Sequence, residues 1–472
     1  MPKIAVIGAG SIVFCKTLMM DIMSTESTAD STFTLMSPGQ EKLSRIEAFA
    51  KRIVSENGLP STVYATTNRR EALRDADYVI LMFQIGGVDA FKIDYEIPLK
   101  YGVDQCIGDS MNAGGIFRSL RSIPVLVDIV KDVQELCPNA LIMNYVNPMA
   151  ACCWALGEAG SVRFVGLCHG VQTTLDLISR YVDVKKEEID YVCAGINHMG
   201  WFLKIEKEGR DLYPILRENI EKPEYYINEK VRCEVMRHFG YFMTESTGHL
   251  SEYLPWFRKN KKALDLYCDQ PAFGGESGAY YNWCKTVADK YREDDFLSYE
   301  SPKLEPRSAE YCSYIIEALE ADKVFRLNGN IRNNGLIADF PDNCCAEVPI
   351  YVDRSGLHPT YIGHLPPQCA AANLSNITVQ GLAVRAGMEG DPELIVAAVA
   401  MDPLTGAVCT LAEAREMTAE MLESEKQWLP QFEGKTLRKA PIISIPAGTK
   451  GIDVPLDPAL AIGHRFGELI QR

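Results

Sequence analysis

The first half of the chain alternates short apolar segments with longer stretches of helical periodicity. Short apolar segments bounded by polar residues are typical of buried strands. Strands are expected over 3–7, 33–36, 77–83, 141–144 and 164–167, and helices after Ser11 and over 41–54, 71–76 and 116–136. Strand–helix alternation with apolar strands requires a parallel sheet covered on both faces. This half is therefore predicted to be an α/β, Rossmann-like, doubly wound parallel sheet.

The second half of the chain loses that regular alternation. A long strand pair is expected over 191–207, interrupted at Asn197 and His198. The further elements are a helical, tyrosine-rich middle, a mixed region over 345–363 and a helix over 404–428. This pattern predicts a C-terminal α+β domain for substrate binding and oligomerisation. The change of rhythm gives domains over 1–195 and 196–472.

Composition and charge narrow the classes of function. The 472 residues are 47% hydrophobic and 24% charged, which is typical of a globular protein with more than one core. The formal net charge of −15 argues against nucleic acid or an anionic membrane as the main partner. No apolar run is long enough to span a membrane. The 15 cysteines are odd in number and irregularly spaced, so we expect a reduced, cytoplasmic protein.

A glycine-rich turn lies where the first strand meets the first helix. Gly8 and Gly10 allow a sharp turn and a close approach to a pyrophosphate, while Ser11 and Ile12 begin a helix whose N-terminus supplies N–H donors. The third glycine of the usual motif is replaced by Val13. The context predicts a dinucleotide-binding loop, and the alternative is a tight turn without a ligand.

The end of the second strand lacks the acidic residue that usually binds the ribose. The chain has Ser37 nearby, whose hydroxyl group is able to bond a ribose hydroxyl. The usual acidic signature therefore does not select NAD over NADP. Gln84 and Asn144, at the ends of two further strands, are expected to complete the cofactor site.

Polar residues that suit a metal ion follow the later strands. Cys168 follows one strand, and His198 interrupts the next. A thiolate and an imidazole on neighbouring strands can bind one divalent ion and leave positions open for substrate oxygens. The alternative is a core thiol and a hydrogen-bonded core histidine.

As a set, the motifs resemble glycoside hydrolase family 4, the NAD- and manganese-dependent glycosidases. The resemblance covers nearly the whole chain. It is carried by Gly8-Ala9-Gly10-Ser11, Phe83 to Gly87, Asp109 to Gly115, Asn144 to Met149, Cys168-His169, Asn197-His198-Met199 and Asn334 to Ile337. Bacterial α-galactosidases of the family are especially similar, through Cys193 to Met199, Gly240 to Tyr253 and Ala400 to Pro403.

The resemblance implies a redox route to glycoside cleavage instead of the usual pair of carboxylates. NAD takes hydride from C3 of the sugar, a base removes the C2 proton, the aglycone leaves by elimination, water adds, and the hydride returns. Mn²⁺ or another divalent metal on the C2 and C3 oxygens stabilises the enediolate. The motif match makes Cys168 and His198 the metal ligands.

The resemblance also implies the catalytic side chains. Tyr253 aligns with the C2 base, although a packed aromatic is the alternative, and Glu245 and His249 are the rival bases. A phenol is a poor base until a nearby metal lowers its pKa, so Tyr253 must lie close to the ion. Asp109 and His169 are the other residues expected in catalysis.

The identity of the sugar is less specified. The loop bordering the sugar reads Asp-Thr-Leu-Gly-Pro-Gly-Gly in the family's α-galactosidases, and here it runs Asp109-Ser110-Met111-Asn112-Ala113-Gly114-Gly115. His169 argues against a phosphorylated sugar, because the 6-phosphoglycosidase branch has Asp or Asn there. The residues expected to contact substrate are Asn112, Arg118, Asn147 and Asn197.

We expect an α-galactosidase-like α-glycosidase that acts on a small-molecule glycoside and forms a homodimer or homotetramer. One alternative is the same mechanism on an anionic or modified sugar, such as a sulfoquinovoside or a uronide. Arg118 and Arg121 would then pair with the anionic substituent, and the alternative for these two residues is that they face solvent. Another is an NAD-dependent 2-hydroxy acid dehydrogenase with His169 transferring the proton, which would produce net NADH. A third is a dinucleotide sensor without catalysis.

Overall fold

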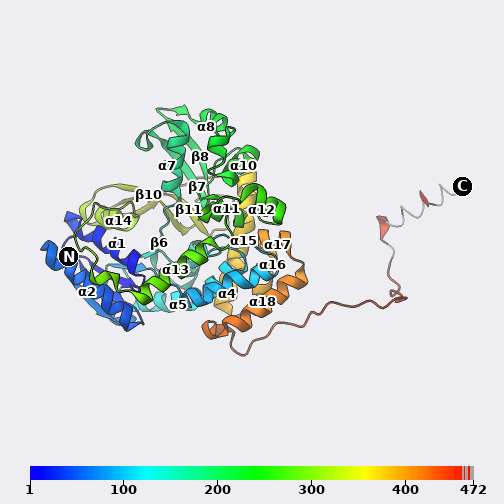
Figure 1. The fold of residues 1–472 in the computed structure, drawn as a ribbon, viewed down its shortest axis with the longest axis horizontal. Helices are drawn as coiled ribbons and strands as arrows, with labels where there is room; N and C mark the ends of the chain where they lie inside the picture. The colour runs from blue at the N-terminus through cyan, green and yellow to red at the C-terminus, as the bar shows by residue number, and fades with distance from the viewer. Residues whose placement is uncertain (456, 460–461, 463–465, 468–472) are drawn as a thin grey trace. The chain divides into compact units, whose positions relative to one another are not determined.

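The structure is a computed structural model that describes residues 1–455, 457–459, 462 and 466–467, without the side chains of residues 12 and 13. The chain divides into two compact units, Met1–Arg438 and Lys439–Arg472. In the second unit, residues 439–455 form no regular helix or strand and are exposed. In the described part of the chain, no helix has the length and apolar character needed to cross a membrane. The elements below all belong to the first unit (Figure 1).

The N-terminal half forms a parallel sheet. Its strands are β1 (Lys3–Ile7), β2 (Thr32–Met36), β3 (Thr62–Thr66), β4 (Tyr78–Leu81), β5 (Leu141–Asn144) and β6 (Arg163–Gly166). They pair in parallel in the order β3-β2-β1-β4-β5-β6, which reverses direction at β1. The helices between them are α1 (Ile12–Met23), α2 (Gln40–Asn57), α3 (Arg69–Leu73), α4 (Gly87–Lys100), α5 (Asn112–Leu136) and α6 (Met149–Ala159). This order confirms the predicted doubly wound fold.

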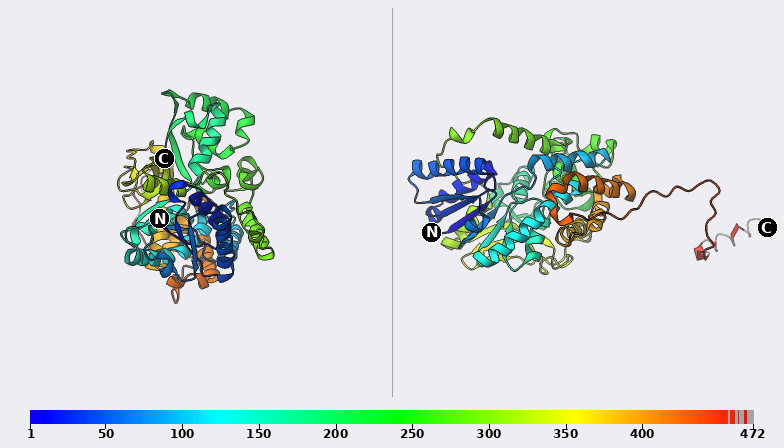
Figure 2. Two further views of the ribbon diagram at one scale, coloured as in Figure 1. Left: turned by 90° about the vertical axis from the view of Figure 1, so that its left-hand side faces the viewer. Right: turned by 90° about the horizontal axis from the view of Figure 1, so that it is seen from below.

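Both faces of this sheet are buried, which explains why its strands are apolar throughout. Successive residues of a strand point to opposite faces. Ile4 and Val6 pack in one core with residues of α1 and α2, while Ala5 and Ile7 pack in another with residues of α3 and α5. Figure 2 shows the N-terminal strands with helices on either side. A sheet covered in this way leaves its strand ends as the places where polar side chains gather.

The second half extends the same sheet with antiparallel strands. They are β7 (Asp190–Ile196), β8 (Met199–Lys207), β9 (Arg210–Asp211), β10 (Phe325–Arg332), β11 (Cys345–Asp353) and β12 (Gly356–Pro359). Beyond β6 the order is β10-β11-β7-β8-β9, and β12 pairs with β11. The strand pair predicted over 191–207 is β7 and β8. Residue 195 lies inside β7, and the two-domain division there stays a prediction.

The remaining helices surround the extended sheet. They are α7 (Gly170–Val182), α8 (Tyr213–Ile220), α9 (Pro223–Tyr226), α10 (Lys230–Phe239), α11 (Thr247–Tyr253), α12 (Lys261–Tyr267), α13 (Ala279–Glu293), α14 (Tyr311–Ala321), α15 (Pro367–Glu389), α16 (Pro392–Met401), α17 (Pro403–Val408) and α18 (Leu411–Glu425). The single helix predicted over 404–428 is wrong. Thr410 and Glu413 form a capping box that starts a new helix, α18, after α17 has ended.

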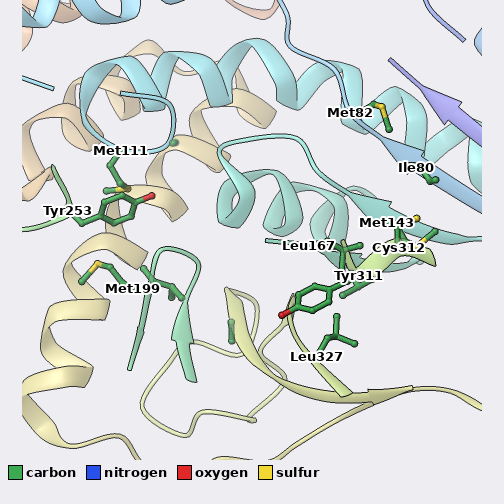
Figure 3. Close-up of a cluster of buried hydrophobic side chains, with 14 of the residues drawn as sticks. Ile80, Met82, Met111, Met143, Leu167, Met199, Tyr253, Tyr311, Cys312 and Leu327 are labelled. Atoms are coloured by element: carbon green, nitrogen blue, oxygen red, sulfur yellow. The ribbon is translucent and has the colours of Figure 1, made fainter. Parts of the chain in front are cut away.

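One hydrophobic core runs through both halves of the sheet. It contains Ile80 and Met143 of the parallel strands together with Met199 and Tyr253 of the second half. Figure 3 shows Tyr253, Met111 and Met199 in one part of this core and Ile80, Met143 and Leu167 in another. The polar site described next is therefore built onto well-packed elements.

Candidate active site

A row of paired residues brings the predicted metal ligands together. Gly166 of β6 pairs with Asn330, Asn330 with Glu347, and Glu347 with Gly195 of β7. Cys168 lies just beyond the end of β6, and His198 lies in the turn between β7 and β8. The prediction that the two residues lie on neighbouring strands is wrong, because β10 and β11 lie between β6 and β7. The side chains of Cys168 and His198 nevertheless meet beyond the strand ends.

Three side chains form a candidate metal site. Ligand atoms of Cys168, His198 and Glu245 all lie within 4.8 Å of one another, and Cys168 Sγ is 4.0 Å from Glu245 Oε1. His198 and Glu245 both have positive φ angles, 64° and 73°. Such angles are uncommon outside glycine and mark turns that aim a side chain. A thiolate, an imidazole and a carboxylate suit a divalent transition metal and leave positions open.

The charges around this cluster also fit a cation. Burial and the negative charge of Glu245 raise the pKa of the Cys168 thiol well above its usual value. Burial lowers the pKa of His198 to about 4, so its imidazole is neutral, as a ligand must be. A divalent cation reverses the effect on the thiol, since a coordinating thiol is deprotonated. The donor set is therefore able to hold a metal.

Helix α11 places two further predicted residues at the cluster. The hydroxyl oxygen of Tyr253 is 3.0 Å from Nδ1 of His198. Burial and the charge of Asp109 raise the pKa of Tyr253 well above its usual value. His249 Nδ1 lies 3.4 Å from Glu245 Oε2, and His249 Nε2 lies 3.7 Å from Asp109 Oδ1. The distance to Asp109 is that of an ion pair and is too long for a hydrogen bond. Burial alone would lower the pKa of His249, but these carboxylates raise it to about 9.

The loop between α4 and α5 contributes an acid, with an amide and a guanidinium beside it. Asn147 Nδ2 donates to Asp109 Oδ2 at 2.9 Å, and Ser110 Oγ donates to Oδ1 at 2.7 Å. Arg118 Nε donates to the carbonyl of Asn147 at 3.2 Å, and its Nη1 is buried without a hydrogen-bond partner. Burial opposes ionisation of Asp109, but His249 and Arg118 hold its pKa well below the usual range. These polar groups suit recognition of sugar hydroxyls.

Two more predicted substrate residues are buried with unused polar atoms. Asn112 Nδ2 donates to Asp402 Oδ2 at 2.9 Å, while Asn112 Oδ1 has no partner. Asn197 Nδ2 and Glu347 Oε1 are also buried without partners. Burial and the charge of Glu245 raise the pKa of Glu347 to about 8. Asn112 thus has a structural role already, and its role toward substrate stays a prediction.

Arg121 has neither of the roles considered for it from sequence. Its side chain is buried, and Nη2 lies 2.6 Å from Asp94 Oδ2, while Nη1 pairs with Glu425. Two carboxylates neutralise this guanidinium, so it is not available to an anionic substituent and does not face solvent. Pairing by Arg121 is wrong, which leaves Arg118 alone at the site.

The glycine turn has the shape that a dinucleotide requires. Gly8 has φ 97°, and a Cβ atom there would lie 2.8 Å from the backbone of Met82 at the end of β4. A Cβ atom on Gly10 would lie 3.0 Å from Ser37 Oγ, so the turn and Ser37 are adjacent. The side chain of Ser11 does not cap α1, which leaves the N–H groups at the N-terminus of that helix available to a pyrophosphate. The side chain of Ile12 lies outside the described residues.

Three predicted residues make bonds or ion pairs outside the metal cluster. Gln84 Nε2 donates to the carbonyl of Gly87 at 3.1 Å. The buried side chain of Asn144 donates from Nδ2 to the carbonyl of Val146 and accepts the N–H of Val146 at Oδ1. They shape turns at the strand ends. His169 is not part of the cluster: its exposed ring lies 3.6 Å from Glu310. The cofactor roles of Gln84 and Asn144 and the catalytic role of His169 stay predictions.

Sequence reasoning missed the residues that hold the site in place. Glu245 was considered only as a base, not as a ligand. Glu252 was not considered: its carboxylate accepts the N–H groups of Cys106, Ile107 and Gly108 and so anchors the loop that carries Asp109. Asp402 anchors Asn112, and only its motif had been noticed. Glu252 has no local signature, because its partners are backbone groups distant in sequence, and Asp402 is marked only as the N-cap of α17.

Comparisons with known proteins identify the family of the chain. The model named Family 4 glycosyl hydrolase matches residues 3–184, and the model named Family 4 glycosyl hydrolase C-terminal domain matches residues 193–405. An alpha-galactosidase of Rhizobium meliloti is 42% identical over 91% of this chain and 89% of its own length, and an alpha-galactosidase of Bacillus subtilis is 35% identical over 92% and 100%.

A solved structure shares the fold. The 6-phospho-beta glucosidase of Thermotoga maritima, with manganese, NAD+ and glucose-6-phosphate, superimposes with a TM-score of 0.73 at 23% identity, covering 90% of this chain and 99% of its own. The two family models together match most of the chain, and the curated relatives align along nearly all of their length. The chain therefore belongs to glycosyl hydrolase family 4.

Proposed function

We propose that this glycosidase is an NAD- and divalent-metal-dependent α-galactosidase. The observation that carries the proposal is the cluster of Cys168, His198 and Glu245 with the hydroxyl of Tyr253 on the imidazole of His198. The sugar assignment rests on the two relatives named alpha-galactosidase, which match nearly the whole chain.

The chain offers a place for each of the two groups. NAD, bound at the Gly8–Gly10 turn and the N-terminus of α1, supplies a hydride acceptor for C3 of the sugar and a donor for its return. Mn²⁺ or a similar cation, held by Cys168, His198 and Glu245, supplies Lewis acidity that favours the ionised forms of nearby sugar hydroxyls and of the Tyr253 phenol. The relative from Thermotoga maritima contains both NAD+ and manganese.

The protein's own residues bind the sugar and move its protons. Asp109, Asn147 and Arg118 offer an acceptor, an amide and an unpaired N–H for its hydroxyls. Tyr253 accepts the proton from C2 once C3 is a ketone, which makes that proton acidic. Elimination of the leaving group, addition of water at C1 and reduction at C3 would then complete hydrolysis. His249 and Glu245 are the rival acceptors of the C2 proton.

The proposal also specifies conditions. Thiolate is the metal-binding form of cysteine, and oxidation of Cys168 removes it, so we propose a reducing compartment such as the cytoplasm. The homodimer or homotetramer expected from the sequence stays a prediction.

The test is a panel of nitrophenyl α- and β-glycosides, neutral and anionic, assayed with NAD, manganese and a thiol reductant. We expect turnover of the α-galactoside that stops with EDTA and returns with manganese. Full turnover by dialysed enzyme in excess EDTA contradicts the metal, and turnover only of a uronide contradicts the sugar. Stoichiometric accumulation of NADH would instead favour a simple dehydrogenase, because a glycosidase of this type returns its hydride.

A further inference from the structure

Three aromatic side chains form a surface next to the site, and we call Phe273, Tyr280 and Trp283 the aromatic platform. The rings of Tyr280 and Trp283 are stacked, with centroids 5.8 Å apart and planes 14° from parallel. Phe273 packs edge-on against Tyr280 at 6.1 Å. Phe273 is 42% exposed and Trp283 53% exposed, which is unusual for two such large rings side by side. Contiguous exposed rings of this kind mark binding sites.

The aromatic platform is continuous with the catalytic residues. The ring centroids of Tyr280 and Phe91 are 5.7 Å apart, and the guanidinium of Arg118 lies 5.4 Å from the Phe91 centroid. Phe273 borders α11, since a Cβ atom on Gly248 would lie 2.5 Å from the carbonyl oxygen of Phe273. Helix α11 carries His249 and Tyr253. The platform therefore lies against both Arg118 of α5 and helix α11.

Backbone bonds and charge confirm this proximity. The N–H of Tyr280 donates to the carbonyl of Cys106 at 3.0 Å, and the N–H of Gly278 donates to that of Gln105 at 2.7 Å, in the segment that leads to Asp109. Burial raises the pKa of Tyr280, the negative charge of Asp109 raises it further, and Arg118 opposes them. Tyr280 is thus close enough to Asp109 and Arg118, which we assign to sugar binding, for their charges to shift its pKa.

We propose that the aromatic platform is the subsite for the leaving group and that its occupant is a second sugar ring. This inference rests on the proposed function, because it needs a glycosidic bond held at the metal cluster. A pyranose ring has an apolar C–H face that packs on aromatic rings, while its hydroxyls reach polar groups at the margin. A second copy of the chain is a poorer occupant. The exposed parts of three rings offer roughly 300 Å², whereas a stable interface needs about 800 Å² per partner.

The experiment compares two α-galactosides that differ only in the leaving group: a galactosyl disaccharide and methyl α-galactoside. Trp283→Ala is expected to lower kcat/KM for the disaccharide about tenfold, and to leave the methyl glycoside within about twofold of wild type. Trp283→Tyr keeps a ring and should recover most of the loss. Tyr361→Ala, which removes a ring that is 69% exposed elsewhere, is the matched control and should change neither value.

Other outcomes overturn the inference. Equal losses on both substrates would mean that Trp283 supports the catalytic cluster itself, and no loss would mean that the platform is not used. A loss confined to nitrophenyl α-galactoside would make the occupant an aryl group. A change of oligomeric state in light scattering of Trp283→Ala would make the platform an interface between copies.

Failure of the proposed function is seen separately. If wild-type enzyme does not hydrolyse methyl α-galactoside, the galactosidase assignment fails, whatever Trp283 does. Binding of the disaccharide to wild type and to Trp283→Ala is then compared by saturation-transfer NMR. Weaker saturation with the variant supports the platform, and equal saturation overturns it.

Discussion

The two sides of the active site are held in opposite ways. On the ligand side, Cys168, His198 and Glu245 face one another with few protein bonds to fix them, and turns with positive φ aim two of them. On the loop side, the segment that carries Asp109 is bonded to the carboxylate of Glu252, and Asn112 is bonded to Asp402. Under the proposed function, the first side needs a cation to complete it, whereas the second is preorganised by the protein alone. Removing a group should therefore have different consequences on each side.

The largest effect is expected on the ligand side. Cys168→Ser and His198→Ala should each lower kcat/KM by roughly 10³ or more, because the metal supplies several kcal/mol of charge stabilisation. Both variants should remain folded, with a modest fall in the melting temperature of His198→Ala, because that buried ring packs against His249. Metal content and turnover are measured together. Cys409→Ser, which alters a half-buried thiol outside the cluster, is the control. Near wild-type turnover with unchanged metal content would show that the ligands are misassigned.

Tyr253→Phe removes a proton acceptor between the two sides while keeping the ring that packs in the core. We expect kcat to fall by roughly 10²–10³, the usual contribution of a general base, with substrate and NAD still bound. A small burst of NADH, stalled before elimination, should be visible by absorbance.

Deuterium labelling tests whether the C2 proton is removed, and by which residue. In deuterated water, wild-type enzyme should release sugar with deuterium at C2, because the proton removed there exchanges before water adds. Unlabelled C2 at full turnover would contradict elimination for this protein. Labelled product from an active Tyr253→Phe variant would keep elimination and make Glu245 or His249 the base.

A smaller effect is expected from the anchor of the loop side. Glu252→Gln retains the size of the side chain but replaces charge-assisted bonds to three backbone N–H groups with neutral ones. We expect kcat/KM to fall about tenfold as Asp109 loses its position, and the melting temperature to fall by a few degrees. Glu413→Gln is the matched control, because Glu413 also accepts a backbone N–H but lies on α18. Unchanged kinetics in Glu252→Gln would mean that the loop needs no anchor.

The smallest effect concerns the ion pairs of His249 in metal-free protein. The pKa of His249 is about 9 in the folded chain, and about 6.5 when unfolded. Its stabilising contribution is therefore complete below about pH 6.5 and is lost as the pH rises through about 9. Urea unfolding at about pH 6 and about pH 9.5 should show wild type losing roughly 1–3 kcal/mol more than His249→Gln. Parallel losses in both proteins would contradict the charged histidine.

The strand ends of the parallel sheet could be predicted because their signals are local. Gly8, Gly10 and Cys168 each follow an apolar strand, at the edge of the sheet where ligands of such folds bind. Glu245 could not be identified as a ligand, since it lies in a loop whose path depends on packing far from it in sequence. Strand β10 was missed as well: its Asn328, Gly329 and Asn330 interrupt the apolar pattern, because the buried asparagine side chains bond backbone carbonyls of other strands.

The pairing of β6 with β10 has a consequence for how the protein is made. The parallel strands are synthesised early, but the outer edge of β6 is paired only after β10 is made, through Asn330 and Gly166. Strand β7 likewise pairs with β11 only after Glu347 is made. From the synthesis of β6 until that of β10, the nascent chain exposes an unpaired strand edge, which is a template for aggregation. We therefore expect chaperones to bind this intermediate, and the yield of folded protein to rise at low expression temperature.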